Sequence, residues 1–156
     1  MEVKHDLSNE MCASSDEEKP YMKKVPYASA VGSIMYAVRC TRPDVKFAQN
    51  LVSRYQQNPG KLHWVAVKHI LKYLRNTKDM FLVYEGNPDT ELEVTGFCDA
   101  SWQCDKDDMK SQTGYVFVVN GGAVDWKSKK KTTIAMHAMQ SEYMAASEAA
   151  MEAVWI

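Results

Sequence analysis

Two acidic residues, Asp99 and Glu142, are the side chains of this sequence whose type and setting could support chemistry. Asp99 ends a run in which polar and apolar residues alternate, a pattern typical of a β-strand. Glu142 lies near the start of an Ala- and Met-rich segment with helical character. Carboxylate oxygens are the ligands that Mg²⁺ prefers. This pair could bind one Mg²⁺ weakly, but two carboxylates could not hold two metal ions.

Three antiparallel strands and one helix are expected to position these carboxylates. The first β pattern covers residues 92–99, and two more cover residues 114–119 and 123–127. Asn120-Gly121 predicts a hairpin between the last two, because a type I′ turn needs positive φ at both central residues. A short strand is expected at residues 80–84, followed by a Gly-Asn-Pro-Asp turn at residues 86–89.

The N-terminal half is predicted to be helical over residues 25–77. Pro26 suits a first helical turn, and Thr41 can cap a second helix. The break at Asn58-Pro59-Gly60 precedes a third helix. Residues 1–24 carry an acidic, polar cluster and are expected to form a disordered arm.

Composition narrows the class of protein. The chain has 156 residues, of which 46% are apolar, enough for one domain or two small ones. Its formal charge of −1 is too small to attract the whole chain electrostatically to nucleic acid or to an anionic membrane. No stretch could span a membrane, and residues 1–24 lack the apolar run of a secretory signal. The four cysteines show no C-x-x-C pairing, which favours a reduced protein without a zinc site.

Four segments in order carry a specific resemblance: GFCDASW, KSQTGYVF, GGAVDWKSKK and SEYMAASEAAMEAVW. They resemble the ribonuclease H domain at the end of Ty1/copia retrotransposon polyproteins. The upstream segments PYASAVGSIMYAVRCTRPDVKFAQN and LHWVAVKHILKYLRNT are similar to the helical region after the reverse transcriptase palm in the same polyproteins. The resemblance covers residues 22–156.

The resemblance implies an α+β fold: a helical N-terminal half, then a truncated ribonuclease H-like domain of three antiparallel strands and one helix. The expected organisation is an arm at residues 1–24, a helical segment at 25–84 and the ribonuclease H-like part at 85–156. Because the family's next strands would follow Ile156, we expect an exposed apolar face on the last helix, carrying Met144, Met151 and Trp155.

The same resemblance defines what Asp99 and Glu142 would do. Ribonuclease H cleavage uses two Mg²⁺ ions about 4 Å apart, held by four carboxylates in this family. Asp99 matches the strand aspartate that bridges both ions, and Glu142 matches the helix glutamate that holds one. Their carboxylates are then expected within about 4–7 Å of each other. Ser101 and Gln140 replace acidic residues found in many members.

With the later aspartate strand also absent, we predict that Asp99 and Glu142 are vestigial, that no catalytic metal is bound and that the chain is not a working nuclease. Mg²⁺ and an RNA–DNA hybrid enter only under the alternative hypothesis, in which the missing strands are supplied.

A second resemblance is to short retroelement-like chains that are secreted RxLR-type effectors of plant-pathogenic oomycetes. Arg39-Cys40-Thr41-Arg42 approximates their Arg-x-Leu-Arg translocation motif, and Asp16-Glu17-Glu18 is similar to the accompanying acidic element but precedes it. This resemblance implies secretion, then action in the nucleus or cytoplasm of a host plant cell, where an unknown protein is bound and cell death is suppressed. The alternative is a translated retroelement relic that has no function and is unstable alone. Outside the effector interpretation a cytoplasmic protein is expected, with no membrane partner.

Several other polar groups have a structural and a functional interpretation. Lys61, Lys68, Lys72 and Arg75 form a solvated helix face, or contact a nucleic-acid backbone as the family resemblance suggests. His69 is interpreted as a packed or surface histidine.

The acidic loop at residues 101–111 is interpreted as a polar surface loop in preference to a metal site. The basic run at residues 127–131 guards a strand edge or contacts an RNA–DNA hybrid.

Overall fold

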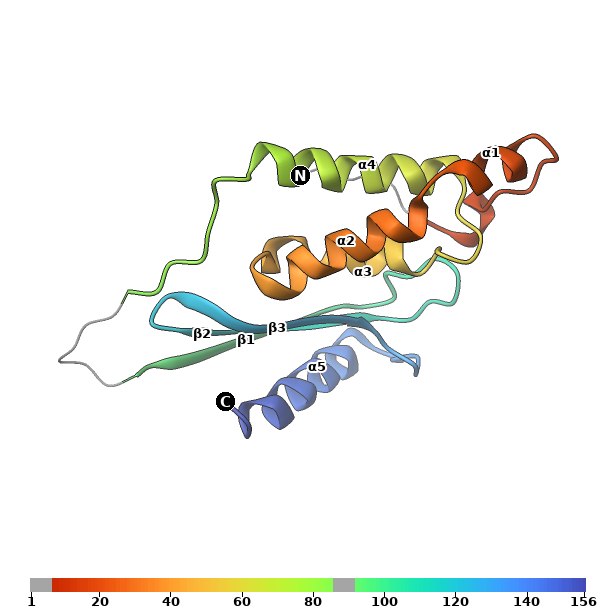
Figure 1. The fold of residues 1–156 in the computed structure, drawn as a ribbon. Coiled ribbons are helices and arrows are strands. Elements are labelled where there is room, and N and C mark those ends of the chain that lie inside the picture. Colours follow the sequence, from red (N-terminus) through yellow and green to blue (C-terminus); the bar gives the residue numbers. More distant parts are fainter. Residues whose placement is uncertain (1–6, 86–91) are drawn as a thin grey trace. The chain divides into compact units, whose positions relative to one another are not determined.

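The computed structural model describes residues 7–85 and 92–156 of the chain (Figure 1). The predicted turn at residues 86–89 lies outside the described residues. The chain divides into two compact units, residues 1–80 and residues 81–156, called here the helical unit and the sheet unit. The α+β fold class, with a helix-rich N-terminal half and a three-stranded antiparallel sheet, is confirmed.

The helical unit contains the three main helices that the sequence predicts. The expected boundaries at Pro26 and Gly60 are found, since these residues are the N-caps of α2 and α4. The predicted cap at Thr41 is wrong: its N–H still bonds to the Ala37 carbonyl, so Thr41 is the C-cap of α2, and the next helical segments begin at Pro43 and Lys46. In chain order the elements are η1 (Asn9–Met11), α1 (Glu18–Lys24), α2 (Tyr27–Cys40), η2 (Pro43–Val45), α3 (Lys46–Ser53) and α4 (Lys61–Asn76).

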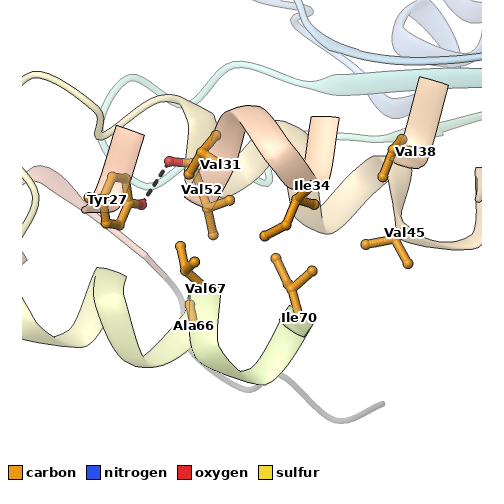
Figure 2. Packing of buried hydrophobic residues seen from close by; sticks show 9 residues of the cluster. All are labelled: Tyr27, Val31, Ile34, Val38, Val45, Val52, Ala66, Val67 and Ile70. Carbon is orange, nitrogen blue, oxygen red and sulfur yellow. Dashed lines mark hydrogen bonds between the residues drawn. The ribbon is translucent and has the colours of Figure 1, made fainter. Parts of the chain in front are cut away.

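One apolar cluster holds α2, α3 and α4 together (Figure 2). Its members are buried and follow the helical repeat: Tyr27, Val31, Ile34, Val38, Val45, Val52, Ala66, Val67 and Ile70. Burying each large aliphatic side chain contributes about 1.5–3 kcal/mol. The Tyr27 hydroxyl donates a hydrogen bond of 2.8 Å to the Val52 carbonyl, so its polar atom is satisfied inside the cluster. Burial raises the pKa of this hydroxyl.

The predicted disordered arm is wrong for residues 7–24, which fold onto the helical unit. The Tyr55 hydroxyl donates to the Leu7 carbonyl at 2.9 Å, and His63 Nε2 lies 3.2 Å from the Ser8 carbonyl. His63 Nδ1 accepts the Gly60 N–H at 3.0 Å, and its ring stacks on Tyr55. The polar composition suggested disorder, but the buried side chains of Tyr55, after α3, and His63, in α4, supply partners for the backbone of this segment.

Gly60 is required by the same contact. A Cβ atom at this position would collide with the Met11 carbonyl oxygen, so only glycine lets the N-terminal segment approach. Just beyond it, the Lys61 N–H donates to Glu18 Oε1 at 2.9 Å. The start of α4 is therefore joined to both η1 and α1.

The sheet unit consists of β1 (Val94–Ser101), β2 (Gln112–Val119), β3 (Gly122–Lys130) and α5 (Ala138–Ala153). The strands are antiparallel in the order β1-β2-β3. Asn120 and Gly121 both have positive φ, 45° and 82°, which confirms the predicted hairpin turn. The predicted strand at residues 80–84 is wrong: Tyr84 and Glu85 hydrogen-bond to Ala123 and Asn120 without forming a strand.

Helix α5 covers one face of β1 and β2. Thr113, Tyr115 and Phe117 of β2 are buried on that face. The Phe117 ring lies against Gly96 of β1, where a Cβ would come within 2.7 Å of the ring. Side chains alternate along a strand, so Gly96, Cys98 and Ala100 share this face of β1.

Candidate functional site

Asp99 is placed in β1 opposite Gly114 of β2, with an exposed side chain. Its neighbour Ala100 pairs with Thr113, whose hydroxyl donates to Glu148 of α5 at 3.1 Å. Thr113 therefore points toward α5, and Ala100 with it. Because successive side chains alternate, Asp99 points to the opposite face of the sheet.

Glu142 lies in the second turn of α5 and is also exposed. The helix meets the sheet through Ser141, Ala145 and Glu148, which recur at helical spacing. Glu142 follows Ser141 by one residue and so lies about 100° around the helix from this stripe. It is also about 9 Å along the axis from Glu148. The structure thus brings β1 and α5 together, but the two carboxylates leave them in different directions.

The expected separation of 4–7 Å stays a prediction.

The other carboxylates near this end of the sheet are engaged in ion pairs. Glu148 pairs with Lys131 at 2.9 Å, and Asp105 pairs with Lys130 at 2.8 Å. Burial opposes ionisation of Glu148, but the hydrogen bond and charge of Lys131, the hydrogen bond from Thr113 and the charge of Lys127 together outweigh it and lower the pKa of this carboxyl. Within residues 7–85 and 92–156, no three His, Cys, Asp or Glu side chains gather where they could hold a metal ion. These residues do not fit a two-metal site, which needs several carboxylates around each ion.

Asp105 is a buried residue that sequence reasoning treated as part of a surface loop. Its Oδ1 accepts the backbone N–H groups of Asp107 and Asp108, at 3.0 and 3.3 Å. Burial would raise the pKa of Asp108, but hydrogen bonds from Lys130 and Lys110 outweigh it and lower that pKa to about 2. The signal was the spacing Asp-x-Asp-Asp, which is typical of an Asx-type turn.

Arg42, the last residue of the translocation-like motif, is only 7% exposed. Its Nε and Nη2 donate to the two carboxylate oxygens of Asp44 at 3.0 and 2.7 Å. It also donates to the carbonyl and hydroxyl of Thr77, and its guanidinium lies 5.5 Å from the centre of the Tyr73 ring. The hydrogen bond from Arg42 is the main cause that lowers the pKa of Asp44.

The other three motif residues, Arg39, Cys40 and Thr41, are exposed at the end of α2. In the folded helical unit only part of the motif is therefore accessible.

Some basic residues have partners within the chain and others are exposed, while Lys61 is exposed and also lies over the Tyr21 ring. Lys130 and Lys131 form the ion pairs described above, and Lys127 lies over the Tyr115 ring. Lys129 is exposed, as are the four basic residues of α4: Lys61, Lys68, Lys72 and Arg75. The exposed group can contact solvent or a ligand, whereas the paired lysines stabilise the sheet unit.

The most unusual surface of the sheet unit is apolar. On α5, Met139, Tyr143 and Met151 are 82%, 76% and 61% exposed. Trp155, beyond the helix end, is 86% exposed. The predicted exposure is confirmed for Met151 and Trp155, while Met144 is half-buried. Exposed large apolar side chains at this density mark a surface that favours contact with other molecules.

In the described part of the chain, no helix has the length and apolar character needed to cross a membrane.

No protein-family model and no solved structure matches this sequence. A retrovirus-related Pol polyprotein from transposon TNT 1-94 of Nicotiana tabacum is 47% identical over 150 residues, covering 96% of this chain and 11% of the polyprotein. The corresponding polyprotein from transposon RE2 of Arabidopsis thaliana is 34% identical, over 83% of this chain and 9% of the polyprotein. The chain thus spans about a tenth of the length of these relatives.

Secreted RxLR effector protein 161 of Plasmopara viticola, unlike the polyproteins, is similar to this chain over nearly its whole length. It is 44% identical over 135 residues, which are 86% of this chain and 94% of that protein.

Proposed function

This chain belongs to the family of retrovirus-related Pol polyproteins from Ty1/copia-type transposons, and we propose that it acts by binding another protein and not by catalysis. The observation that carries the proposal is the exposed apolar surface of α5 formed by Met139, Tyr143 and Met151. An amphipathic helix that offers such anchors to solvent fits a complementary groove on a partner. The charged pair Glu148–Lys131 lies on the side of α5 that meets the sheet and leaves the exposed surface apolar.

The setting we propose for this interaction is a host plant cell, in which the chain acts as a secreted RxLR-type effector that suppresses cell death. The support is the similarity to the Plasmopara viticola effector, which extends over nearly the whole of that protein. The motif itself contributes less, because Arg42 is held by Asp44 and Thr77 in the folded unit.

Expression in plant cells, with defence-related cell death as the measurement, tests this function. We expect wild-type chain and the double variant Asp99→Asn/Glu142→Gln to suppress cell death equally, since the proposal does not use these carboxylates. The double variant Tyr143→Gln/Met151→Gln, which keeps good helix-forming residues on α5, should lose suppression. Suppression that needs Asp99 and Glu142 but tolerates the α5 variant would overturn the proposal, as would no suppression by wild type.

A second candidate function is part of a ribonuclease H that cleaves the RNA of an RNA–DNA hybrid. The observation that favours it is the placement of Asp99 and Glu142 on the adjacent elements β1 and α5, both exposed and both outside the ion pairs of the described residues. Additional carboxylates from another segment or another copy would be needed to hold two Mg²⁺ ions.

A further inference from the structure

His63 lies in the first turn of α4, and its side chain is fully buried, at 0% exposure. Its Nδ1 accepts the Gly60 N–H at 3.0 Å, so Nδ1 carries no hydrogen. The hydrogen of the neutral ring is then on Nε2, which lies 3.2 Å from the Ser8 carbonyl and donates to it. Both contacts are made only by a neutral ring in this tautomer.

A proton added to this ring would conflict with its surroundings. Imidazolium carries a hydrogen on both nitrogens, so the new Nδ1–H would face the Gly60 N–H, donor against donor. The positive charge would lie in the first turn of a 16-residue helix, whose dipole disfavours a cation there. It would also be buried away from water, which costs free energy. The folded helical unit therefore favours the neutral ring.

Residues 7–13 lie against His63 from outside the three-helix cluster. Their one helical element is the single turn η1, which has no buried residue. Side chains of the helical unit hold three of their carbonyls: Tyr55 bonds to Leu7 at 2.9 Å, His63 to Ser8, and Asn58 to Ala13 at 3.4 Å. Helices α2, α3 and α4 instead share the buried apolar cluster. Release of residues 7–13 is thus a smaller opening than separation of the helices, and it would admit water to the ring.

We propose that His63 is a pH-sensitive switch: the neutral ring holds residues 7–13 on α4, and uptake of a proton releases them. The released state exposes the ring and the N-terminus of α4 to solvent. The switch lies in the helical unit, so it does not depend on the function assigned to the α5 surface.

The neighbours of the ring keep their charges over the range in which it titrates. Glu18 Oε1 accepts the Lys61 N–H at 2.9 Å, and Glu10 of η1 is exposed. Histidine is the side-chain type that ordinarily changes charge between about pH 5 and 8. The described titratable groups of the elements around the ring are Glu10 and Cys12 of residues 7–13, Glu18 of α1, Tyr27 of α2, Tyr55 after α3 and Lys61 of α4.

The direction of the pH effect follows from the number of bound protons. In the released state the ring is in water, where histidine binds a proton below about pH 6.5. The docked ring binds none at Nδ1, so docking is fully stabilised above about pH 6.5 and weakens as the pH falls below that value. One proton shifts the equilibrium toward the released chain about tenfold between about pH 7.5 and pH 5.5.

Hydrogen exchange of single amides, followed by NMR on the full chain and corrected for the intrinsic effect of pH, tests the proposal. The reporters are the N–H groups of Met11, Cys12 and Gly60, which are bonded in the docked state. Their protection should fall about tenfold between about pH 7.5 and pH 5.5, while the Ile34 amide within α2 keeps its protection. Unchanged protection of the reporters, or an equal loss at Ile34, would overturn the switch.

Two variants assign the effect to one ring. His63→Gln supplies a donor and an acceptor but takes up no proton in this range, so its reporters should be equally protected at both pH values. His69→Gln, at an exposed histidine of the same helix, is the matched control and should respond as wild type does. A wild-type response in His63→Gln would reject His63 as the group that titrates.

Nitrogen NMR of the wild-type ring decides the matter even if His63→Gln fails to dock residues 7–13 at either pH. Such spectra distinguish the Nε2–H tautomer from imidazolium, so they observe the proton directly. The ring should be the Nε2–H tautomer at about pH 7.5 and should become charged with the same midpoint as the loss of Gly60 protection. A charged ring with residues 7–13 still docked, or a neutral ring after their release, would contradict the proposal.

Discussion

Arg42 and Asp44 form a two-bonded ion pair in which both carboxylate oxygens accept from the guanidinium, at 3.0 and 2.7 Å. The pair joins η2 to the end of α4, because Arg42 also bonds to Thr77 and the Tyr73 hydroxyl donates to Asp44 at 2.9 Å. A residue that resembles part of a transport motif thus stabilises the helical unit.

The first prediction concerns that pair. Arg42→Lys should lower the free energy of unfolding of the helical unit by roughly 2–3 kcal/mol, because lysine cannot form the bidentate geometry and leaves a half-buried carboxylate poorly paired. Urea denaturation followed by helical circular dichroism measures it. Arg39→Lys, at an exposed position of the same motif, is the control and should change stability by less than about 0.5 kcal/mol. Equal stabilities for the two variants would show that the ion pair contributes nothing.

A second prediction compares two glycines, one with no room for a Cβ atom and one with open space around it. Gly60→Ala should destabilise the chain by roughly 1–3 kcal/mol, because the new Cβ collides with the Met11 carbonyl and forces the N-terminal segment away. Gly32→Ala, within α2, meets no atom within 4 Å and should stabilise by about 0.5–1 kcal/mol through helix propensity. Thermal unfolding of both variants is the measurement. A neutral Gly60→Ala would mean that residues 7–13 do not dock as described.

The third prediction concerns pH. The folded-state pKa of Asp108 is about 2, below the ordinary 3.8, so its ionised form stabilises the folded state. That contribution is complete above about pH 4–5 and is lost as the pH falls through about 2. The melting temperature of Asp108→Asn should therefore lie below that of wild type at pH 7, and the difference should disappear near pH 2.

Asp99→Asn is the matched control for this pH series, since Asp99 forms no ion pair among the described residues. If Asp108→Asn and wild type already coincide at pH 7, the contacts with Lys130 and Lys110 do not stabilise the loop.

A fourth prediction is that the purified chain, with Mg²⁺ and an RNA–DNA hybrid, releases no product above background. Asp105 and Glu148 are held by lysines, and a misplacement of about 1 Å can already cost a hundredfold in rate. Gel analysis of a labelled hybrid checks this, with Asp99→Asn as the paired sample. Cleavage by wild type that Asp99→Asn abolishes would support the ribonuclease H candidate and reject the non-catalytic function.

Local patterns predicted the elements well. The helical repeat predicted the helices of the N-terminal half, and Asn120-Gly121 located the hairpin turn. These features depend on residues within one turn of each other, so sequence spacing is enough to find them.

The sequence did not predict contacts between distant residues. Arg42 meets Thr77 across 35 positions, and the Tyr55 hydroxyl meets Leu7 across 48. The helical and strand repeats relate only residues that are near in sequence, so they do not predict such contacts. For the same reason the N-terminal segment was judged by its polar composition, and the burial of Asp105 beneath Lys130 was missed. The alternation of β1 was predicted correctly, but the side on which α5 packs, which directs Asp99 away from it, required the fold.

Because Arg42 is buried, a receptor that recognises Arg39 to Arg42 must bind them before the helical unit folds. The guanidinium becomes accessible only when α4 separates from η2, because Tyr73 and Thr77 cover it from α4. Recognition of the full motif would therefore compete with the folding rate of the helical unit. It would be efficient on a nascent or unfolded chain and slow on a folded one.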